Sequence, residues 1–427
     1  MNPTELAEAA RPRRSRIPAA LREREFRRFW AGETVSLFGD QITLLALPLA
    51  AVLVLHAGPA QMGYLGAASL VPNLLFSLHA GALVDRRGLR RQTMIAADLG
   101  RAVLLATIPI AYALDALTLT QLYLVAFLTG ALSVFFFVSY NTLFVSMVPR
   151  ESYVEANSLL AGSRAFSFVA GPSVGGVIVQ VLSAPYALAA DAVSFLLSAY
   201  YLGSIQPEEP ATEDSGDGQV TAGLRFIRRS PTLFASLLAT ATINFFNFVF
   251  FALFILYATR SLHVRPGVLG LVLGAGAIGG LIGSILTGRL SRALGVGRVV
   301  VLGSFLFPVP LLLVPLAGGP KPLVLALLFL AEFGSGLGVM ILDISAASIF
   351  QAVVPDRLRA RFSGAYTFVN YGVRPLGSLV GGVLGSTIGL RPTLWIGAAG
   401  AIAGGLFLLP SPLPHLRTLP ETAEESG

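Results

Sequence analysis

Four ionisable side chains lie deep inside long apolar segments of this 427-residue sequence. An ionised side chain at the centre of a bilayer costs about 2.5–3.5 kcal/mol on insertion scales, so each of the four needs a function or a partner. A buried carboxyl group can exchange a proton, because burial favours its neutral form and a nearby cation favours its ionised form. The four candidates for proton coupling or substrate binding are Asp40, Glu332, Arg374 and Arg164.

The two acids among them occupy comparable depths. Asp40 lies about 11 residues into one apolar segment and Glu332 about 10 residues into another, and a helix rises about 1.5 Å per residue. We therefore expect one or both carboxyl groups to alternate between protonated and ionised states. The alternative is that Asp40 belongs to a structural network with Gln41 or Arg164, since networks of this kind also perturb buried acids.

A structural role is favoured for four charged side chains, two of which are the arginines just named. Asp98 and Arg101 are three positions apart, a spacing that places them on one face of a helix, where they can form an ion pair. Arg164 and Arg374 are expected to steady helix contacts or to neutralise the acids. Nearer the segment ends, water and flexible side chains lower the free-energy cost of a charge. This is the expected position of Glu33, Asp98, Asp191 and Asp343.

Composition identifies the elements that carry these residues. Hydrophobic residues make up 54% of the chain and charged residues only 12%, whereas soluble domains carry about 25% charged residues, so a water-soluble globule is excluded. Cysteine is absent and the four histidines show no metal-ligand spacing, so we expect no disulfide, no metal and no cofactor. Apolar runs separated by proline, glycine and charge clusters predict an all-α polytopic membrane protein with twelve transmembrane helices. The expected spans are 29–54, 62–84, 93–114, 119–147, 156–181, 185–204, 231–258, 267–289, 297–317, 322–349, 361–388 and 392–410.

A polar stretch divides these spans into two sets of six. Val-Pro at 148–149 and 354–355, and Gly-Gly at 175–176 and 381–382, recur at the same offset, so we expect two pseudo-symmetric six-helix bundles. Arginines gather on the side that holds both termini, and the positive-inside rule makes that side cytoplasmic. The expected regions are an arginine-rich N-terminal tail (1–28), a first bundle (29–204), a cytoplasmic linker (205–230), a second bundle (231–410) and a C-terminal tail (411–427).

The turn after the second span contains glycine, aspartate and several arginines. Gly81 permits close helix approach, Asp85 can accept a hydrogen bond from a neighbouring helix N-terminus, and the arginines hold the loop in the cytosol. The alternative is an arginine cluster that only sets the topology. The residues of this expected cytoplasmic gate loop are Gly81, Asp85, Arg86, Gly88, Arg90 and Arg91.

The fifth span combines glycines with an internal proline. Pro172 removes a backbone donor and kinks the helix, while the glycines let another helix pack closely. Generic small-residue packing is the alternative interpretation. The motif consists of Gly162, Gly171, Pro172, Gly175 and Gly176, and the eighth span offers a matching small-residue face in Gly276, Gly279, Gly280 and Gly283.

These two motifs resemble signatures of the major facilitator superfamily. The loop is similar to its GxxxDRxGRR signature, and the fifth span is similar to the antiporter signature of its drug exporters, with Ser167 in place of one glycine. The resemblance covers nearly the whole chain and points to a bacterial branch that includes macrolide and siderophore exporters. It implies a gate loop that latches spans 2 and 11 on the cytoplasmic side, and a cavity lined by spans 1, 4, 7 and 10. Span 4 lacks the charged residue that relatives often carry, which puts a proton site there in doubt.

Aromatic and amide side chains in the fourth and seventh spans suit a pocket for bulky amphiphilic molecules. The run of aromatic residues covers every helical face, so periodicity alone does not choose the residues that face the cavity. We expect Asn244, Asn247, Tyr140 and Asn141 to do so.

The sequence therefore predicts a monomeric secondary active transporter of the inner (plasma) membrane. It would export hydrophobic or amphiphilic small molecules of the drug, antibiotic or siderophore class by proton antiport, with alternating access between the two bundles. No nucleotide-binding loop is present, which excludes ATP-driven pumping, and the net charge of +7 reflects loop arginines rather than nucleic-acid binding. An uptake permease or uniporter on the same fold is the first alternative. A membrane enzyme or signalling scaffold is the second, but it would require a clustered polar catalytic set, and none is visible.

Overall fold

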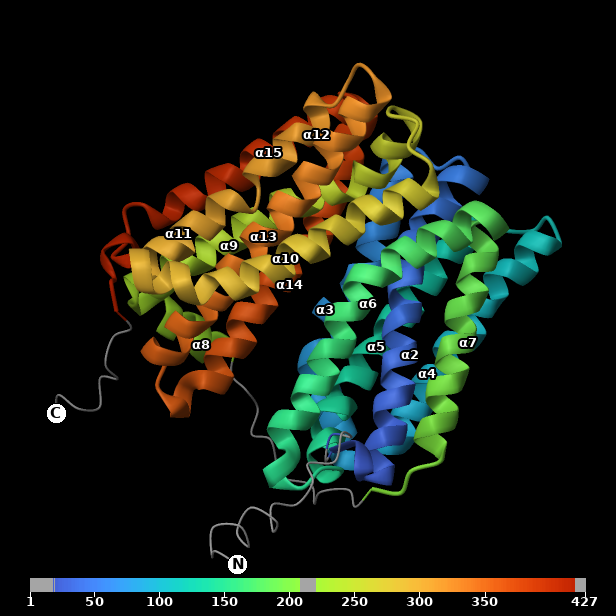
Figure 1. Cartoon of the computed structure of the whole chain (residues 1–427), viewed down its shortest axis with the longest axis horizontal. Coiled ribbons are helices and arrows are strands. Elements are labelled where there is room, and N and C mark those ends of the chain that lie inside the picture. Colours follow the sequence, from blue (N-terminus) through green and yellow to red (C-terminus); the bar gives the residue numbers. More distant parts are fainter. Residues whose placement is uncertain (1–17, 19, 208–219, 419–427) are drawn as a thin grey trace, which may run out of the picture.

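The computed structural model describes residues 18, 20–207 and 220–418, apart from the side chains of residues 78, 79, 81–83, 85–87, 141, 142, 145, 220 and 360. The described residues form helices and connecting turns, with no strand among them. Figure 1 shows the helices in two groups, which lie closest at one end and diverge towards the end at which α2 begins.

The first group contains the helices between residues 20 and 203. A short 3₁₀ turn (Ala20–Arg22) precedes α2, and a π-helical turn (Ala50–Val54) extends it. Gly88 follows α3 and has a φ of +60°, a conformation that glycine adopts without a steric penalty. The chain therefore reverses tightly between α3 and α4. The helices are α2 (Arg24–Leu49), α3 (Pro59–Arg87), α4 (Arg90–Ala113), α5 (Leu119–Ser146), α6 (Tyr153–Leu182) and α7 (Ala184–Gly203).

The second group departs from the predicted spans in two places. Residues 220–229 form a helix inside the expected linker, because Ile227 is fully buried and packs with Phe362 and Ala365 of α14. The ninth span is broken, because Pro308 and Pro310 lie where a continuous helix would need backbone donors. The helices are α8 (Val220–Arg229), α9 (Pro231–Arg260), α10 (Pro266–Leu294), α11 (Val296–Leu306), α12 (Leu313–Leu316), α13 (Lys321–Val353), α14 (Asp356–Thr387) and α15 (Leu390–Gly405).

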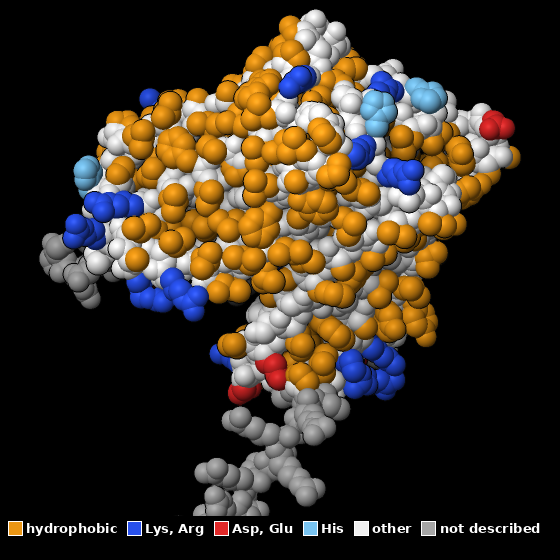
Figure 2. Space-filling model, turned by 45° about the horizontal axis from the view of Figure 1, so that its top comes forward, with side chains coloured by type: hydrophobic (Ala, Val, Ile, Leu, Met, Phe, Trp, Pro, Cys, Tyr) orange, Lys and Arg blue, Asp and Glu red, His pale blue; other side chains and the backbone are white. Residues whose placement is uncertain are grey.

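The chain is an all-α membrane protein. Nine of its described helices are long and apolar enough to cross a bilayer, with mean hydropathies of 1.2 to 2.4. Helical backbone also occupies the other three predicted spans, as α3, α14 and α15. Hydrophobic side chains cover the broad face seen in Figure 2, as a surface in contact with lipid tails requires.

The groups meet mainly at two helix crossings, α6 with α10 and α3 with α14, and α9 also contacts α3 and α2. At the first crossing, a Cβ added to Gly176 would lie 3.1 Å from the Cα atom of Gly270. At the second, a Cβ added to Gly63 would lie 2.7 Å from the Cα atom of Gly382, and the Ser378 hydroxyl donates to the Gly63 carbonyl oxygen at 3.1 Å. The backbones can approach this closely because glycine has no side chain. Both crossings lie at the end where the groups converge.

Candidate functional site

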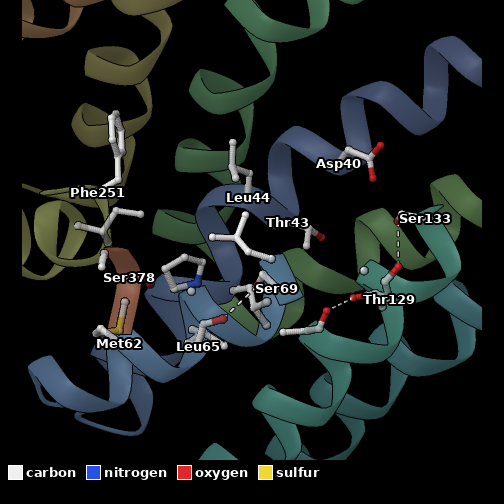
Figure 3. A pocket seen from close by; sticks show the side chains of 18 of the residues that line it. Asp40, Thr43, Leu44, Met62, Leu65, Ser69, Thr129, Ser133, Phe251 and Ser378 are labelled. Carbon is white, nitrogen blue, oxygen red and sulfur yellow. Dashed lines mark hydrogen bonds between the residues drawn. The ribbon is translucent and has the colours of Figure 1, made fainter. Parts of the chain in front are cut away.

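A first cavity of about 530 Å³ lies between the two helix groups. Its volume falls within the roughly 300–1,000 Å³ of small-molecule sites. Asp40 and Thr43 of α2 and Ser133 of α5 line it, and Figure 3 shows Phe251 of α9 on the opposite side. Most of the other lining side chains are apolar. Asp40 therefore lies on the wall of an internal cavity.

A buried ion pair stands beside this cavity. Arg101 of α4, which lines the cavity, pairs with Asp98 as the three-residue spacing predicted, and the two residues are 2% and 0% exposed. The guanidinium carbon lies 4.0 Å from the ring centre of Phe195 and 4.5 Å from that of Phe136. The aromatic faces and the carboxylate together replace the water that the charge gives up.

A second acid of the first group, Asp191 of α7, also lines the first cavity. Its carboxylate accepts hydrogen bonds from the Thr43 hydroxyl at 2.5 Å and the Ser194 hydroxyl at 2.8 Å. Asp191 and Asp98 are fully buried and Glu33 is nearly so, which corrects the expectation that water would reach them near the span ends. Depth along a span does not reveal the neighbouring helices, and here those helices cover the acids. Of that expected set, Asp343 is exposed.

A second cavity of about 510 Å³ adjoins the first, since Leu44, Asn247, Phe251 and Leu273 line both. Glu332 of α13 is buried and is the one ionisable residue among those that line the second cavity. The carboxyl group lies close to α10, because a Cβ added to its Gly276 would come within 3.3 Å of Glu332 Oε2. Asp40 and Glu332 thus occupy adjoining cavities.

The remaining residues expected in the cavity lie in different places. Asn247 lines both cavities, but Asn244 lines neither of them and accepts a hydrogen bond from Arg374 Nε at 3.0 Å. Tyr140 is 7% exposed and stacks on Phe29 at 5.2 Å, so it belongs to the apolar interior of the first group, contrary to the prediction. An aromatic run that is apolar on every face gives no signal for the rotation of its helix. The side chain of Asn141 lies outside the described residues.

The two arginines predicted to lie deep within apolar spans, Arg164 and Arg374, are separated from the acids that line the cavities. Arg374 of α14 contacts Asn244 and lies 4.1 Å from the ring centre of Tyr371. Arg164 of α6 is exposed. Neither arginine lines the two cavities. Arg101, which the sequence analysis treated as structural, is the arginine that lines the same cavity as Asp40. Its position within an apolar span was the available signal.

The expected gate loop is tied to its own group of helices. Arg91 donates to the carbonyl oxygens of Leu202 and Gly203 at 2.8 and 2.7 Å, at the end of α7, and Arg90 is buried. These bonds satisfy helix C-terminal carbonyl groups that have no partner within α7. The described close contacts between α3 and α14 lie at Gly63 and Gly66, towards the other end of α3, and at Leu74, near its middle. The side chains of Asp85 and Arg86, and the surroundings of Gly81, lie outside the described part.

The glycine–proline motif of α6 serves two interfaces. Gly171 and Gly175 face α2 within the first group, whereas Pro172 and Gly176 meet α10 of the second group. An added Cβ on Gly162 would meet no atom within 4 Å. The expected matching face on α10 was wrong. Gly276, Gly279, Gly280 and Gly283 face α13, and Gly267, Gly270 and Gly274 meet α6 instead.

Comparisons with known proteins agree with this architecture. A sequence model described as Major Facilitator Superfamily matches residues 29–378 and 237–426. The multidrug efflux pump Tap of Mycolicibacterium fortuitum is 27% identical over 377 residues, which cover 83% of this chain and 88% of that protein. The staphyloferrin A transporter of Staphylococcus aureus is 23% identical over 353 residues, covering 81% and 86%. A bacterial homologue of the iron transporter ferroportin, in an inward-facing state, shares the fold with a TM-score of 0.74 at 17% identity, covering 91% of this chain and 98% of that one.

Proposed function

The chain belongs to the Major Facilitator Superfamily, and we propose that it exports hydrophobic or amphiphilic small molecules in exchange for protons. Membership and the named relatives make it a membrane transporter and not an enzyme. The efflux pump and the siderophore transporter among those relatives support the drug, antibiotic or siderophore class as cargo.

One observation carries the proposal: adjoining cavities between the helix groups are largely apolar, and each has a carboxyl group on its wall. Asp40 comes from the first group and Glu332 from the second. Apolar walls suit a lipophilic body. A buried carboxyl group can release its proton when a cation approaches and regain it when the cation leaves, which is the exchange that antiport needs.

Alternating access follows from the two crossings. We propose that the bundles 29–204 and 231–410 rock against each other as units in a monomer, with both termini cytoplasmic in the plasma membrane. The convergent end, where α6 meets α10 and α3 meets α14, would then be the extracellular end. In that orientation this conformation is open towards the cytoplasm. Export requires the glycine crossings to separate while the cytoplasmic end closes.

Transport in everted membrane vesicles tests the proposal. A lipophilic primary amine such as a dansyl-labelled pentylamine should accumulate in an acidic vesicle interior beyond the level reached in vesicles without the protein. An uncoupler should release it. Asp40→Asn should abolish this accumulation at normal expression. Asp356→Asn, which removes an exposed acid at the start of α14, should leave it unchanged. Transport that is independent of the imposed pH gradient would instead identify a uniporter. Unchanged transport by Asp40→Asn would show that Asp40 has no part in the mechanism.

A further inference from the structure

Three residues that line the second cavity each have a buried acceptor oxygen without a hydrogen-bond donor among the described residues. These oxygens are Oε1 of Gln41, Oδ1 of Asn247 and Oε1 of Glu332, whose residues are 8%, 8% and 6% exposed. Roughly 90% or more of buried polar groups in proteins are paired. Three unpaired acceptors around one cavity therefore indicate a ligand that brings its own donors.

The charge of this cavity agrees with that reading. No lysine or arginine is among its lining residues, so nothing on its wall compensates an ionised Glu332. The first cavity differs, because Arg101 lies on its wall and Asp191 receives hydrogen bonds from Thr43 and Ser194. An ionised Glu332 would therefore need a positive charge from a ligand, and N–H donors on that ligand would also pair the amide oxygens.

We propose that the second cavity binds the protonated primary or secondary amine of an amphiphilic substrate, with Glu332 as counter-ion and Gln41 and Asn247 as further acceptors. A primary ammonium group has three N–H donors, which match the three oxygens in number. The rings of Phe168, Phe251 and Phe307 line the same cavity and suit the apolar body of such a molecule. The inference names the cargo chemistry of the proposed exporter and so rests on that function.

The site has a consequence for the transport cycle. Gln41 lies on α2 of the first bundle, whereas Asn247 on α9 and Glu332 on α13 belong to the second. An ammonium group held by all three bridges the bundles. Rocking that separates α2 from α9 and α13 would break up the set of acceptors, and the amine would then be released.

The three oxygens also predict selectivity between cations. A quaternary ammonium group has the same charge but no N–H donor, so it would leave the two amide oxygens unpaired. A site that recognised charge alone would accept both kinds of cation equally. The number of N–H donors, at constant charge, therefore distinguishes this site from a general cation pocket.

The test uses the full chain in lipid nanodiscs and two fluorescent probes. A dansyl-labelled pentylamine and its N,N,N-trimethyl analogue share one apolar body and, at pH 7, one positive charge. The amine should bind at least about tenfold more tightly than the analogue. Fluorescence titration without any ion gradient measures both dissociation constants.

Variants assign the effect to the three oxygens. Glu332→Gln should weaken amine binding at least about tenfold. Gln41→Leu and Asn247→Leu should each weaken it several-fold and leave the trimethyl probe unaffected, because only the amine donates to these oxygens. The matched control is Gln121→Leu, since Gln121 of α5 donates to Thr107 and lines neither cavity. It should bind both probes as the wild type does.

Equal affinities for the two probes, or amine binding that survives Glu332→Gln unchanged, would overturn the inference. If Glu332→Gln fails to fold, the two leucine variants provide the test. Equal affinities of these variants for the two probes would support the inference, and an unchanged preference for the amine would contradict it. Binding is measured here without a gradient. Absence of proton-driven export in vesicles would therefore overturn the proposed function and leave this amine site intact.

Discussion

The two halves of the molecule use the same backbone contacts but stabilise charge differently. The glycine pair of α6 has one member, Gly175, against α2 of its own half and the other, Gly176, against α10 of the opposite half. The pair at the same repeat position in α14 behaves alike, because Gly381 meets Val249 of α9 and Gly382 meets Gly63 of α3. The repeat has therefore kept the positions where backbones must touch.

Charged groups do not follow that symmetry. The first half buries a paired cluster, in which Arg101 bonds Asp98 and Asp191 takes two hydroxyl donors. The second half buries Glu332 without a donor among the described residues to its Oε1 atom. One of the contacts between its helices α9 and α14, that of Thr240 with Tyr366, joins two neutral groups. The backbone contacts are therefore symmetric between the halves, whereas the buried charged groups are not.

Removal of Arg101 should have the largest effect on stability. Arg101→Leu leaves Asp98 buried without its partner, and breaking a buried ion pair in this way costs about 3–5 kcal/mol. Unfolding of the purified protein in mixed micelles, followed by tryptophan fluorescence, measures the loss. The matched change in the second half is Glu332→Leu, which breaks no ion pair and should leave the free energy of unfolding unchanged or raise it. Similar losses in both variants would contradict the contrast between the halves.

The hydrogen bond from Thr43 to Asp191 should rank next. Thr43→Val keeps the side-chain shape and removes one donor to a buried carboxylate, and bonds to charged groups contribute about 1.5–3 kcal/mol. The same unfolding assay measures the change. Ser194→Ala removes the other hydroxyl donor to Asp191 and provides a second measurement of how far that carboxylate depends on its donors. No loss in either variant would show that Asp191 does not depend on these donors.

Larger side chains at the two glycine crossings should have similar effects on the closure of the convergent end. Gly176→Leu and Gly382→Leu place side chains where backbones meet. Overpacking of this kind typically costs about 1–3 kcal/mol, so it should destabilise the conformation in which the convergent end is closed. A cysteine at Ser284, which lines the second cavity, should then react several-fold faster with an impermeant thiol reagent from outside. The native chain has no cysteine, so this residue reports alone. Gly162→Leu is the control, because nothing lies near that position; an unchanged rate in both crossing variants would refute the role of the crossings.

Much of the fold was predictable from the sequence. Composition and apolar runs indicated an all-α membrane protein, and the family resemblance is confirmed. The Asp98–Arg101 pair followed from helical spacing, because positions three apart share a face whatever surrounds them. Proline interrupted the ninth span at 308 and 310, a signal that hydropathy alone concealed.

Contacts between helices were harder to predict, because they depend on how each helix is rotated. Tyr140 lies in an aromatic run with no polar face, so nothing in the run distinguished the interior of the bundle from the cavity. The glycines of α10 presented two small-residue faces, and the sequence did not reveal which one met α6. Asp191 appeared close to a span end, yet neighbouring helices bury it completely. Roles for Asp40 and Glu332 remain predictions, although both acids line cavities.

The smallest expected loss of stability comes from a hydrogen bond between two neutral groups in the second half. Thr240→Val removes the 2.8 Å hydrogen bond between Thr240 and the Tyr366 hydroxyl, which joins α9 to α14. Both partners are neutral, so the loss should be about 0.5–1.5 kcal/mol, below that of Thr43→Val in the equivalent first helix of the other half. A double-mutant cycle with Tyr366→Phe isolates the pair. If Thr240→Val cost as much as Thr43→Val, the difference between the halves would not arise from charge, and the asymmetry would have to be sought in packing.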